Sequence, residues 1–223
     1  LVYTPFLNKK LSSQDYDKML VTLPKLLEKT FNSVYKNNGL RTGKNFIIFN
    51  VMEKILTSFL IEEKSQIAKG IDLKILVLEY RFYKPIWVKG LEKEIFFKGS
   101  IDRIDSLDGV IRFVDYKTGN VTASDLSFRD WDELISDPKK SALFQVLLYA
   151  YALKDEFKED KVKGGVIPLK NFENNFIAAS KTEKSRTKTA IEMNESIFSN
   201  FEKELFTIIN EIFDPNIPFV FKT

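Results

Sequence analysis

The chain has 223 residues, of which 44% are hydrophobic and 29% charged, and it contains neither cysteine nor histidine. This length buries an adequate core without disulfides. The missing residue types exclude disulfides, Cys or His zinc sites, iron–sulfur clusters and Ser–His or Cys–His catalysis within these residues. Acid–base or metal chemistry must therefore use Asp, Glu, Lys or Tyr, and an oxygen-rich metal site favours Mg²⁺, Mn²⁺ or Ca²⁺.

The net charge is only +3, so basicity alone does not indicate a nucleic-acid partner. No apolar run reaches the roughly 18 residues of a membrane span, and no secretory signal opens the chain. These features predict a soluble, cytoplasmic protein with no membrane partner. Because the chain begins at Leu1 rather than Met, we expect it to be a fragment of a longer protein.

The first 70 residues are predicted to be helical. One helix begins at residues 12–13, where serines can cap it, and Pro24 should kink or break it before residues 37–39 end it. A second helix is predicted from Asn45 to Lys69, ended by Gly70. Their apolar stripes are interpreted as core packing and comprise Tyr16, Met19, Leu20, Leu23, Leu26, Leu27, Phe31, Phe46, Phe49, Met52, Ile55, Leu56, Phe59 and Leu60.

Strand-like segments follow. The predicted strands are 73–82, a weaker 86–88, 94–106, 110–117, and a late pair at 162–169 and 175–179. The predicted helices are 125–135, 140–157 and 191–213. This order favours one α/β domain over 1–223 with a mixed, mostly antiparallel central sheet flanked by helices. Its expected parts are a helical part at 1–70, the sheet and helices at 71–180, and a closing helix at 190–213.

The most informative segment is a predicted hairpin over 99–119. Asp108-Gly109 separates two alternating runs, and both residue types tolerate the positive φ of a two-residue turn. The register implied by this turn pairs Ile104 with Phe113, Asp105 with Arg112, and Asp102 with Asp115.

Two carboxylates paired across a ladder lie about 5 Å apart. At an effective dielectric constant near 20, their repulsion is of the order of 3 kcal/mol. Lys117 shares the face of Asp102 and Asp115 and would offset part of it, and a divalent cation would offset more. A solvated face that binds nothing explains the hairpin alone equally well.

Gly-x-x-Asp-Arg-Ile-Asp at 99–105, with Val-Asp-Tyr-Lys-Thr-Gly at 114–119, resembles the RecB- and AddB-type nuclease domains of the PD-(D/E)xK superfamily. The resemblance continues at Gln145 and Tyr149, which match a Gln-x-x-x-Tyr motif on the following helix. It implies a restriction-endonuclease-like core with an N-terminal helical segment.

The resemblance also implies a role for each matching residue. Asp102, Asp115 and the backbone carbonyl of Tyr116 would bind Mg²⁺ or Mn²⁺. Lys117 would activate the attacking water, and Gln145 and Tyr149 would position the active site and the nucleic acid. No small-molecule cofactor is expected beyond the metal.

The sequence departs from this family in two ways. Relatives usually carry a metal-binding histidine on an early helix, and Asn50 or Glu53 lies in that region without being a secure substitute. Glu79 is another acid that could approach the site, with Glu94 less favoured. Several relatives also end in cysteines for an iron–sulfur cluster, which this chain lacks.

Two further features weigh less. Residues 181–188 contain four basic side chains that could contact phosphates, although a solvated loop is the simpler interpretation. They are Lys181, Lys184, Arg186 and Lys188. Trp87 and Trp131 could stack on bases, but partial burial is the favoured interpretation for each.

The leading interpretation is a Mg²⁺-dependent DNA nuclease, in exonuclease mode, that hydrolyses phosphodiester bonds in single strands or ends. It would be part of a recombination or repair system with a helicase domain or subunit. The main alternative is a catalytically inert domain of the same fold that binds DNA or braces a partner subunit. A metal-binding domain unrelated to nucleic acid is a third alternative.

Overall fold

The computed structural model describes residues 2–35, 43–157, 160–170, 176–183 and 187–218. The helices are α1 (Ser13–Tyr35), α2 (Gly43–Ala68), α3 (Glu133–Ser136), α4 (Ser141–Ala152) and α5 (Glu195–Phe213), with short 3₁₀ turns η1 (Thr4–Phe6) and η2 (Pro138–Lys140). The strands are β1 (Leu73–Val88), β2 (Lys93–Leu107), β3 (Val110–Lys117), β4 (Ser127–Phe128), β5 (Val162–Pro168), β6 (Ile177–Ala178), β7 (Ser180–Thr182) and β8 (Lys188–Ala190).

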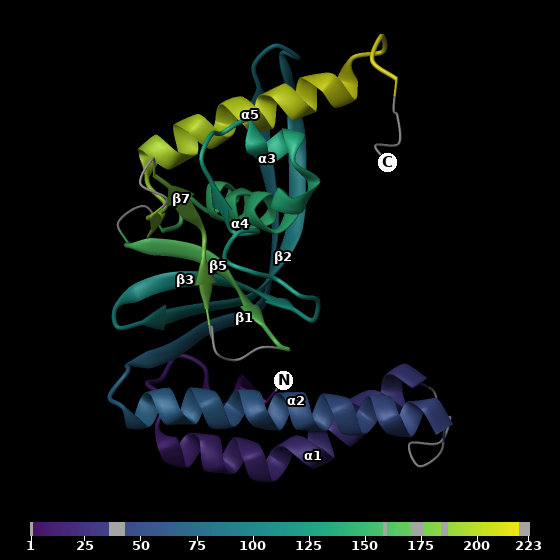
Figure 1. Cartoon of the computed structure of the whole chain (residues 1–223), viewed down its shortest axis with the longest axis vertical. Coiled ribbons are helices and arrows are strands. Elements are labelled where there is room, and N and C mark those ends of the chain that lie inside the picture. The colour runs from purple at the N-terminus through teal and green to yellow at the C-terminus, as the bar shows by residue number, and fades with distance from the viewer. Residues whose placement is uncertain (1, 36–42, 158–159, 171–175, 184–186, 219–223) are drawn as a thin grey trace.

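The central sheet has the strand order β1-β2-β3-β5-β6. Only β3 and β5 are parallel, because α4 supplies the crossover between them, and the other pairs are antiparallel. Helices α4 and α5 lie on one side of this sheet and the α1–α2 pair on the other (Figure 1). The predicted mixed, mostly antiparallel sheet with N-terminal helices is therefore confirmed. A second small sheet, β4-β7-β8, was not predicted.

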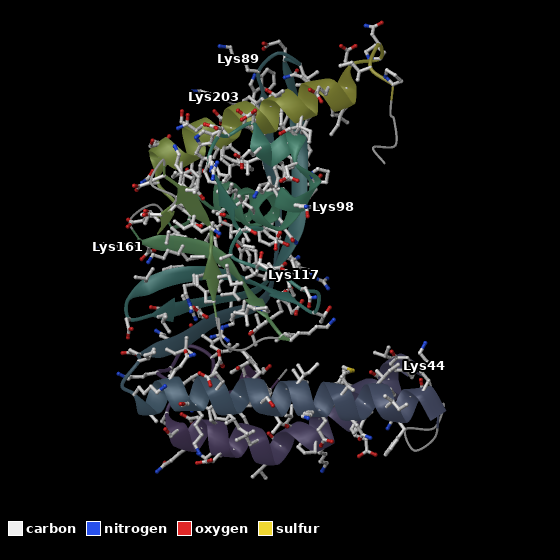
Figure 2. The ribbon with its side chains drawn as sticks, viewed as in Figure 1. Lys44, Lys89, Lys98, Lys117, Lys161 and Lys203 are labelled. Atoms are coloured by element: carbon white, nitrogen blue, oxygen red, sulfur yellow. The ribbon has the colours of Figure 1, made fainter. Side chains whose placement is uncertain are left out.

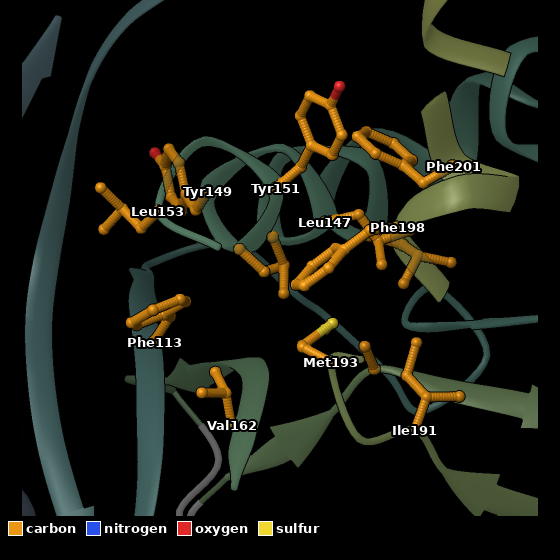
Figure 3. Packing of buried hydrophobic residues seen from close by; sticks show 14 of the residues in the cluster. Phe113, Leu147, Tyr149, Tyr151, Leu153, Val162, Ile191, Met193, Phe198 and Phe201 are labelled. Atoms are coloured by element: carbon orange, nitrogen blue, oxygen red, sulfur yellow. The ribbon is translucent and has the colours of Figure 1, made fainter. Parts of the chain in front are cut away.

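Each face of the sheet carries its own apolar core. The core beneath α4 and α5 includes Phe113, Leu147 and Phe201 (Figure 3). Helix α4 approaches β5 closely because Gly164 has no side chain, and a Cβ there would lie 2.3 Å from Val146 Cγ1. The second core joins α1 and α2 to the opposite face.

A buried ionic network also joins α2 to the sheet. Arg103 is fully buried, and its Nη1 donates to Glu63 Oε1 at 2.8 Å while its Nε donates to Asp105 Oδ2 at 2.6 Å. Arg112 donates to both oxygens of Asp105 from the neighbouring strand. Tyr16 donates a further hydrogen bond to Glu63. The two arginines thus have carboxylate partners, as buried charges require.

The N-terminal segment pairs with the free edge of the sheet. The backbone N–H of Asn8 donates to the Ile75 carbonyl at 2.8 Å, and that of Leu11 donates to the Leu73 carbonyl at 2.9 Å. A β-bridge joins Lys10 to Lys74 between these bonds. The first half of β1 therefore has backbone partners on both sides.

Several element predictions are confirmed. Gly70 ends α2 with a φ of 96°, which favours glycine. The late antiparallel strand pair is present as β5 and β6. None of the described helices is long and apolar enough to cross a bilayer.

Of the kink or break predicted at Pro24, the break is wrong. Helix α1 continues through it, because Pro24 is exposed and water can hydrate the carbonyl it leaves unpaired. The predicted stop at residues 37–39 lies outside the described residues. The core interpretation of the α2 stripe holds for Phe59 and Leu60 but not for its first half, where Phe46 is 46% exposed. That half extends past the sheet beside α1 (Figure 1).

The helix predicted at 125–135 is also wrong for most of its length. Residues 127–128 form β4 and pair with β7, so tertiary pairing overrides the local propensity, and only α3 remains helical. Helix α4 ends at Ala152, short of the predicted residue 157. The two strands predicted at 73–82 and 86–88 are one continuous strand, with Pro85 inside it on the edge of the sheet.

Candidate active site

The predicted hairpin is present with its predicted register. Asp108 and Gly109 have φ values of 49° and 82°, so both turn residues adopt the left-handed conformation of a tight hairpin. Asp105 faces Arg112, and their side chains form a two-pronged ion pair with N–O distances of 2.7 and 2.9 Å. The ladder between β2 and β3 is regular as far as Arg103 and Val114.

The ladder ends one step before the two predicted carboxylates would pair. Asp102 Oδ2 instead accepts a hydrogen bond from the backbone N–H of Tyr116 at 2.8 Å. Asp102 and Asp115 thus lie just beyond the last ladder pair, where the strands separate. The half-buried Asp102 is anchored to β3 through the backbone and keeps acceptor capacity on its carboxylate.

Asp115 is the buried member of the pair, with 5% of its surface exposed. Burial raises its pKa, and the charge of Asp102 raises it further, while Lys117 acts in the opposite direction. Lys117 Nζ lies 2.8 Å from Asp115 Oδ2. Apart from this ionic contact, Oδ2 has no partner among the described residues.

Lys117 connects the carboxylates to α4. Its Nζ donates to Gln145 Oε1 at 2.7 Å, and Gln145 Nε2 donates to Tyr149 Oη at 2.5 Å. Lys117 lies at the end of β3, between the sheet and α4 (Figure 2), and Tyr149 projects from α4 at the edge of the core (Figure 3). The structure therefore brings Asp115, Lys117, Gln145 and Tyr149 into one continuous chain of contacts.

Tyr149 is supported from below by β1. Its ring packs edge-on against Phe82, with centroids 6.0 Å apart. Phe82 in turn lies over Gly99 on β2, where an added Cβ would be 2.7 Å from the Phe82 ring. The glycine that opens the Gly-x-x-Asp-Arg motif thus makes room for the ring beneath Tyr149.

Glu79 lies on β1 at the level of Asp102, between the ladder pairs Leu78–Arg103 and Tyr80–Ile101. Its φ of 52° is unusual for a glutamate within a strand, and its side chain is exposed. Asn50 and Glu53 lie on the half of α2 that extends past the sheet, and Glu94 is exposed near the far end of the β1–β2 hairpin.

The donor set suits a hard divalent cation. Asp115 offers a buried carboxylate oxygen whose described contact is the Lys117 ammonium group, and Asp102 offers a second carboxylate nearby. Mg²⁺ commonly takes one or two protein carboxylates and keeps water or phosphate in its other positions. No group of three or more acids suited to a metal occurs among the described residues.

The side chain of Tyr116 points away from these carboxylates. Its hydroxyl accepts a hydrogen bond from Arg103 Nη1, and its ring packs edge-on against Phe59 of α2. Burial raises the pKa of Tyr116 to about 12, and the Arg103 charge opposes this rise. The side chain of Tyr116 is therefore occupied by other contacts, and the predicted ligand role concerns its backbone carbonyl alone.

An open apolar groove of about 330 Å³ lies between the α1–α2 pair and the sheet, and Glu79, Asp102 and Tyr116 are among its lining residues. The predicted phosphate-binding residues lie elsewhere. Lys181 and Lys188 are exposed on the small sheet, and Lys184 and Arg186 lie outside the described residues. Within the described segments, no hydrogen bond or ion pair links either lysine to the carboxylates.

An acidic pair beside a lysine, where the end of β3 lies against β2 and α4, supplies the oxygen ligands and the positive charge that metal-assisted phosphodiester hydrolysis uses. The chain belongs to the PD-(D/E)XK nuclease superfamily, whose family model matches residues 12–221. This class of protein acts on nucleic acids, typically with divalent metal ions. A comparison with curated proteins found no match.

Sequence reasoning missed the residues that support the site. Glu63 was not singled out, although a buried arginine at position 103 requires an acidic partner. Phe82 was predicted only as part of a strand, and its contact with Tyr149 was not. Neither contact has a local signal, because Glu63 and Arg103 are 40 residues apart, and Phe82 and Tyr149 are brought together only by the packing of α4 on the sheet.

Proposed function

We propose that this protein is a metal-dependent DNA nuclease of the RecB and AddB type that hydrolyses phosphodiester bonds in single strands or at ends, in exonuclease mode. The chain of contacts from Asp115 through Lys117 to Gln145 and Tyr149, beside Asp102, is the observation that carries this proposal. A role in recombination or repair beside a helicase domain or subunit follows from the resemblance by analogy.

In this proposal, Asp102, Asp115 and the Tyr116 carbonyl hold Mg²⁺ or Mn²⁺, with Glu79 as an additional ligand. When bound, the metal would lower the pKa of a water molecule and stabilise negative charge on the phosphate. Lys117 orients the attacking water and offsets charge on the scissile phosphate. Gln145 fixes Lys117 Nζ, and Tyr149 fixes the Gln145 amide.

The basic side chains after β6 have a supporting role in the proposal. Lys181, Lys184, Arg186 and Lys188 would contact backbone phosphates at a distance from the reacting bond. Such contacts carry no sequence information and depend strongly on salt.

The decisive experiment is cleavage of end-labelled single- and double-stranded DNA with Mg²⁺, Mn²⁺ or EDTA by the parent protein and by Lys117→Ala. We expect metal-dependent cleavage that falls by at least about a hundredfold in the variant, because an activating group has been removed. Lys161→Ala, at an exposed lysine beside β5, is the control and should cleave like the parent. Equal activity of Lys117→Ala and the parent would contradict the proposal.

An inert scaffold that binds DNA or braces a partner is the second candidate. It is favoured by the absence of histidine from the chain and of a three-acid cluster from the described residues. Parent protein that binds DNA but does not cleave it with either metal would support this candidate.

A further inference from the structure

Strands β1 and β2 continue past the active site as a two-stranded ribbon formed by residues 80–88 and 93–101. The side chains of this ribbon alternate between its two faces. Phe82, Ile86 and Phe97 point to the core beneath α4 and α5. The opposite face, which we call the outer face, is covered by none of the described helices and strands, and Figure 1 shows the ribbon rising beside α4 to the level of α5.

The outer face displays three large aromatic side chains. Tyr83 is 64% exposed, Trp87 59% and Phe96 46%. The rings of Tyr83 and Phe96 are stacked across the two strands, with centroids 4.8 Å apart and an interplanar angle of 11°. The partial burial predicted for Trp87 is therefore wrong, whereas Trp131 is half-buried against Phe128 as predicted.

Two cations lie beside the Tyr83–Phe96 pair, while Glu94 is directly opposite Trp87. Lys98 is directly opposite Tyr83. Arg81 precedes Tyr83 by two residues and lies on the same face. Residues 80–100 contain five basic and two acidic side chains. Lys84 forms an ion pair with Glu156 on the inner face. Within the described part of the chain, Arg81 and Lys98 form no ion pair, so both charges remain available to a ligand.

The outer face leads directly to the active site. Lys98, Ser100 and Asp102 are successive alternate residues of β2, and Arg81 pairs with Ser100 on the neighbouring strand. Figure 2 shows Lys98 on the outside of the ribbon, above Lys117. The outer face therefore continues along β2 to Asp102, which lines the groove between the sheet and the α1–α2 pair.

We propose that the outer face of the ribbon binds a single strand of nucleic acid, whose bases stack on Trp87 and on the Tyr83–Phe96 pair while Lys98 and Arg81 contact its phosphates. Proteins bind unpaired bases without sequence preference by combining exposed aromatic rings, on which bases stack, with cations that contact the backbone. The proposal rests on the proposed nuclease function, since it identifies how substrate is held outside the reacting centre.

Trp87 supplies a direct test that does not require catalysis. In a Trp131→Phe protein, Trp87 is the only tryptophan, and its fluorescence is titrated with oligothymidylate of about 12 nucleotides in EDTA. We expect saturable, salt-sensitive quenching. Tyr83→Ala combined with Phe96→Ala should raise the Kd roughly tenfold or more, because stacking of at least one base is lost. Lys98→Gln should reduce the salt slope by about 0.7.

Tyr35→Ala is the matched control. Tyr35 is also an exposed ring stacked on a neighbour, Phe31, but it lies at the far end of α1. It should bind oligothymidylate like the parent. Equal affinity of the Tyr83/Phe96 double variant and the parent would overturn the proposal. Binding that leaves Trp87 emission unchanged would also overturn it. No binding at all would overturn it too, and would favour a protein partner for the outer face.

Cleavage assays on the same variants separate this proposal from the nuclease proposal. Quenching that is lost in the double variant, without cleavage by any form, supports the ribbon site and contradicts the nuclease. Cleavage that depends on Lys117, with quenching unaffected by the double variant, supports the nuclease and contradicts the ribbon site.

Discussion

Lys117 has two acceptors of different kind, the Asp115 carboxylate and the Gln145 amide oxygen. The carboxylate attracts the ammonium group from any direction, but the amide oxygen restricts it to one. Tyr149 fixes which end of the Gln145 amide faces Lys117, because its hydroxyl accepts from Gln145 Nε2. A proposed catalytic lysine is therefore oriented by two residues that need not touch the substrate.

This orientation can be tested with Tyr149→Phe. The variant keeps the ring against Phe82 but removes the acceptor for Gln145 Nε2, so the amide can rotate and Lys117 is held less well. We expect kcat for metal-dependent cleavage to fall about tenfold, with little change in KM.

The matched control for this prediction is Tyr151→Phe. Tyr151 donates to Glu202 of α5 and, among the described residues, forms no hydrogen bond with Lys117 or Gln145, so loss of its hydroxyl should leave kcat unchanged. Equal kcat values for the two variants would show that the Tyr149 hydroxyl has no positioning role.

For individual residues, the sequence predicted the turn and the carboxylates that lie close together in the structure. The turn at Asp108-Gly109 determines the register, and the register brings Asp102 close to Asp115. The sequence could not predict that the β2–β3 ladder would end before Asp102 and Asp115, because the separation of the strands depends on how β3 continues into the next loop. The exposure of Trp87 was also missed, since a single aromatic residue carries no signal for which face is covered.

At the scale of elements, the site depends on how closely β1, β2 and α4 approach one another. Phe82 fills the space above Gly99 and supports the Tyr149 ring. A side chain at position 99 would move Phe82 toward α4. The distance between β1 and α4 therefore affects where Gln145 and Tyr149 hold Lys117.

Gly99→Ala should reduce both stability and kcat. Overpacking of this kind costs about 1–3 kcal/mol. Phe82→Leu in the same chain should recover much of the stability by relieving the contact at 2.7 Å. Urea unfolding measures the first effect, with Gly119→Ala as the control for stability, since a Cβ there meets nothing within 4 Å. Loss of stability in both glycine variants alike would contradict this account.

Helix α1 begins with reciprocal hydrogen bonds between Ser12 and Asp15. The Asp15 N–H donates to Ser12 Oγ, while the Ser12 N–H and Oγ donate to Asp15 Oδ2. Burial alone would raise the pKa of Asp15, but the hydrogen bonds from Ser12 and from Lys9 outweigh it, so the pKa is lowered.

A lowered pKa in the folded state predicts how stability depends on pH. The ionised carboxylate stabilises the fold above the ordinary Asp pKa of about 3.9, and this contribution is lost as the pH falls through the lower folded value. Asp15→Asn should therefore unfold more easily than the parent at pH 7 and match it in strong acid. A difference in Tm that is constant across a pH series would contradict the expected linkage.

Helices and strands were predicted well where local sequence signals agree with the tertiary contacts. The hairpin strands and the end of α2 at Gly70 are examples. The segment 125–135 was not, because β4 exists only through pairing with β7, more than 50 residues away. The first half of α2 was assigned to the core because an apolar stripe does not reveal whether a partner surface extends far enough to cover it.

For the whole molecule, the α1–α2 pair is joined to the sheet by an apolar core and by one buried polar cluster. Glu63 of α2 is the link, because it accepts from Arg103 of the sheet, from Tyr3 near the N-terminus and from Tyr16 of α1. Arg103 and Arg112 share Asp105, so this cluster of charges balances only when Glu63 is docked against it.

This link predicts strong coupling between Glu63 and Arg103. Glu63→Leu leaves a buried arginine with one partner fewer and should cost about 3–5 kcal/mol. Arg103→Met in the same chain should recover part of that loss, giving a coupling energy of about 0.5–3 kcal/mol in a double-mutant cycle measured by urea unfolding. Additive losses would show that the two side chains do not stabilise the docked state together.

The pairing of residues 8–11 with β1 has a consequence for how copies of this protein meet. A bare edge strand offers its unpaired backbone groups to the edge of another molecule, which is a common route to aggregation. Here the carbonyls of Leu73 and Ile75 are already occupied by the chain's own N–H groups, and the register shift between Ile75 and Val77 interrupts the edge just beyond them. Residues 8–11 thus block this part of the sheet edge from pairing with a second copy. Their removal would leave the backbone carbonyls of Leu73 and Ile75 free to accept hydrogen bonds from another molecule.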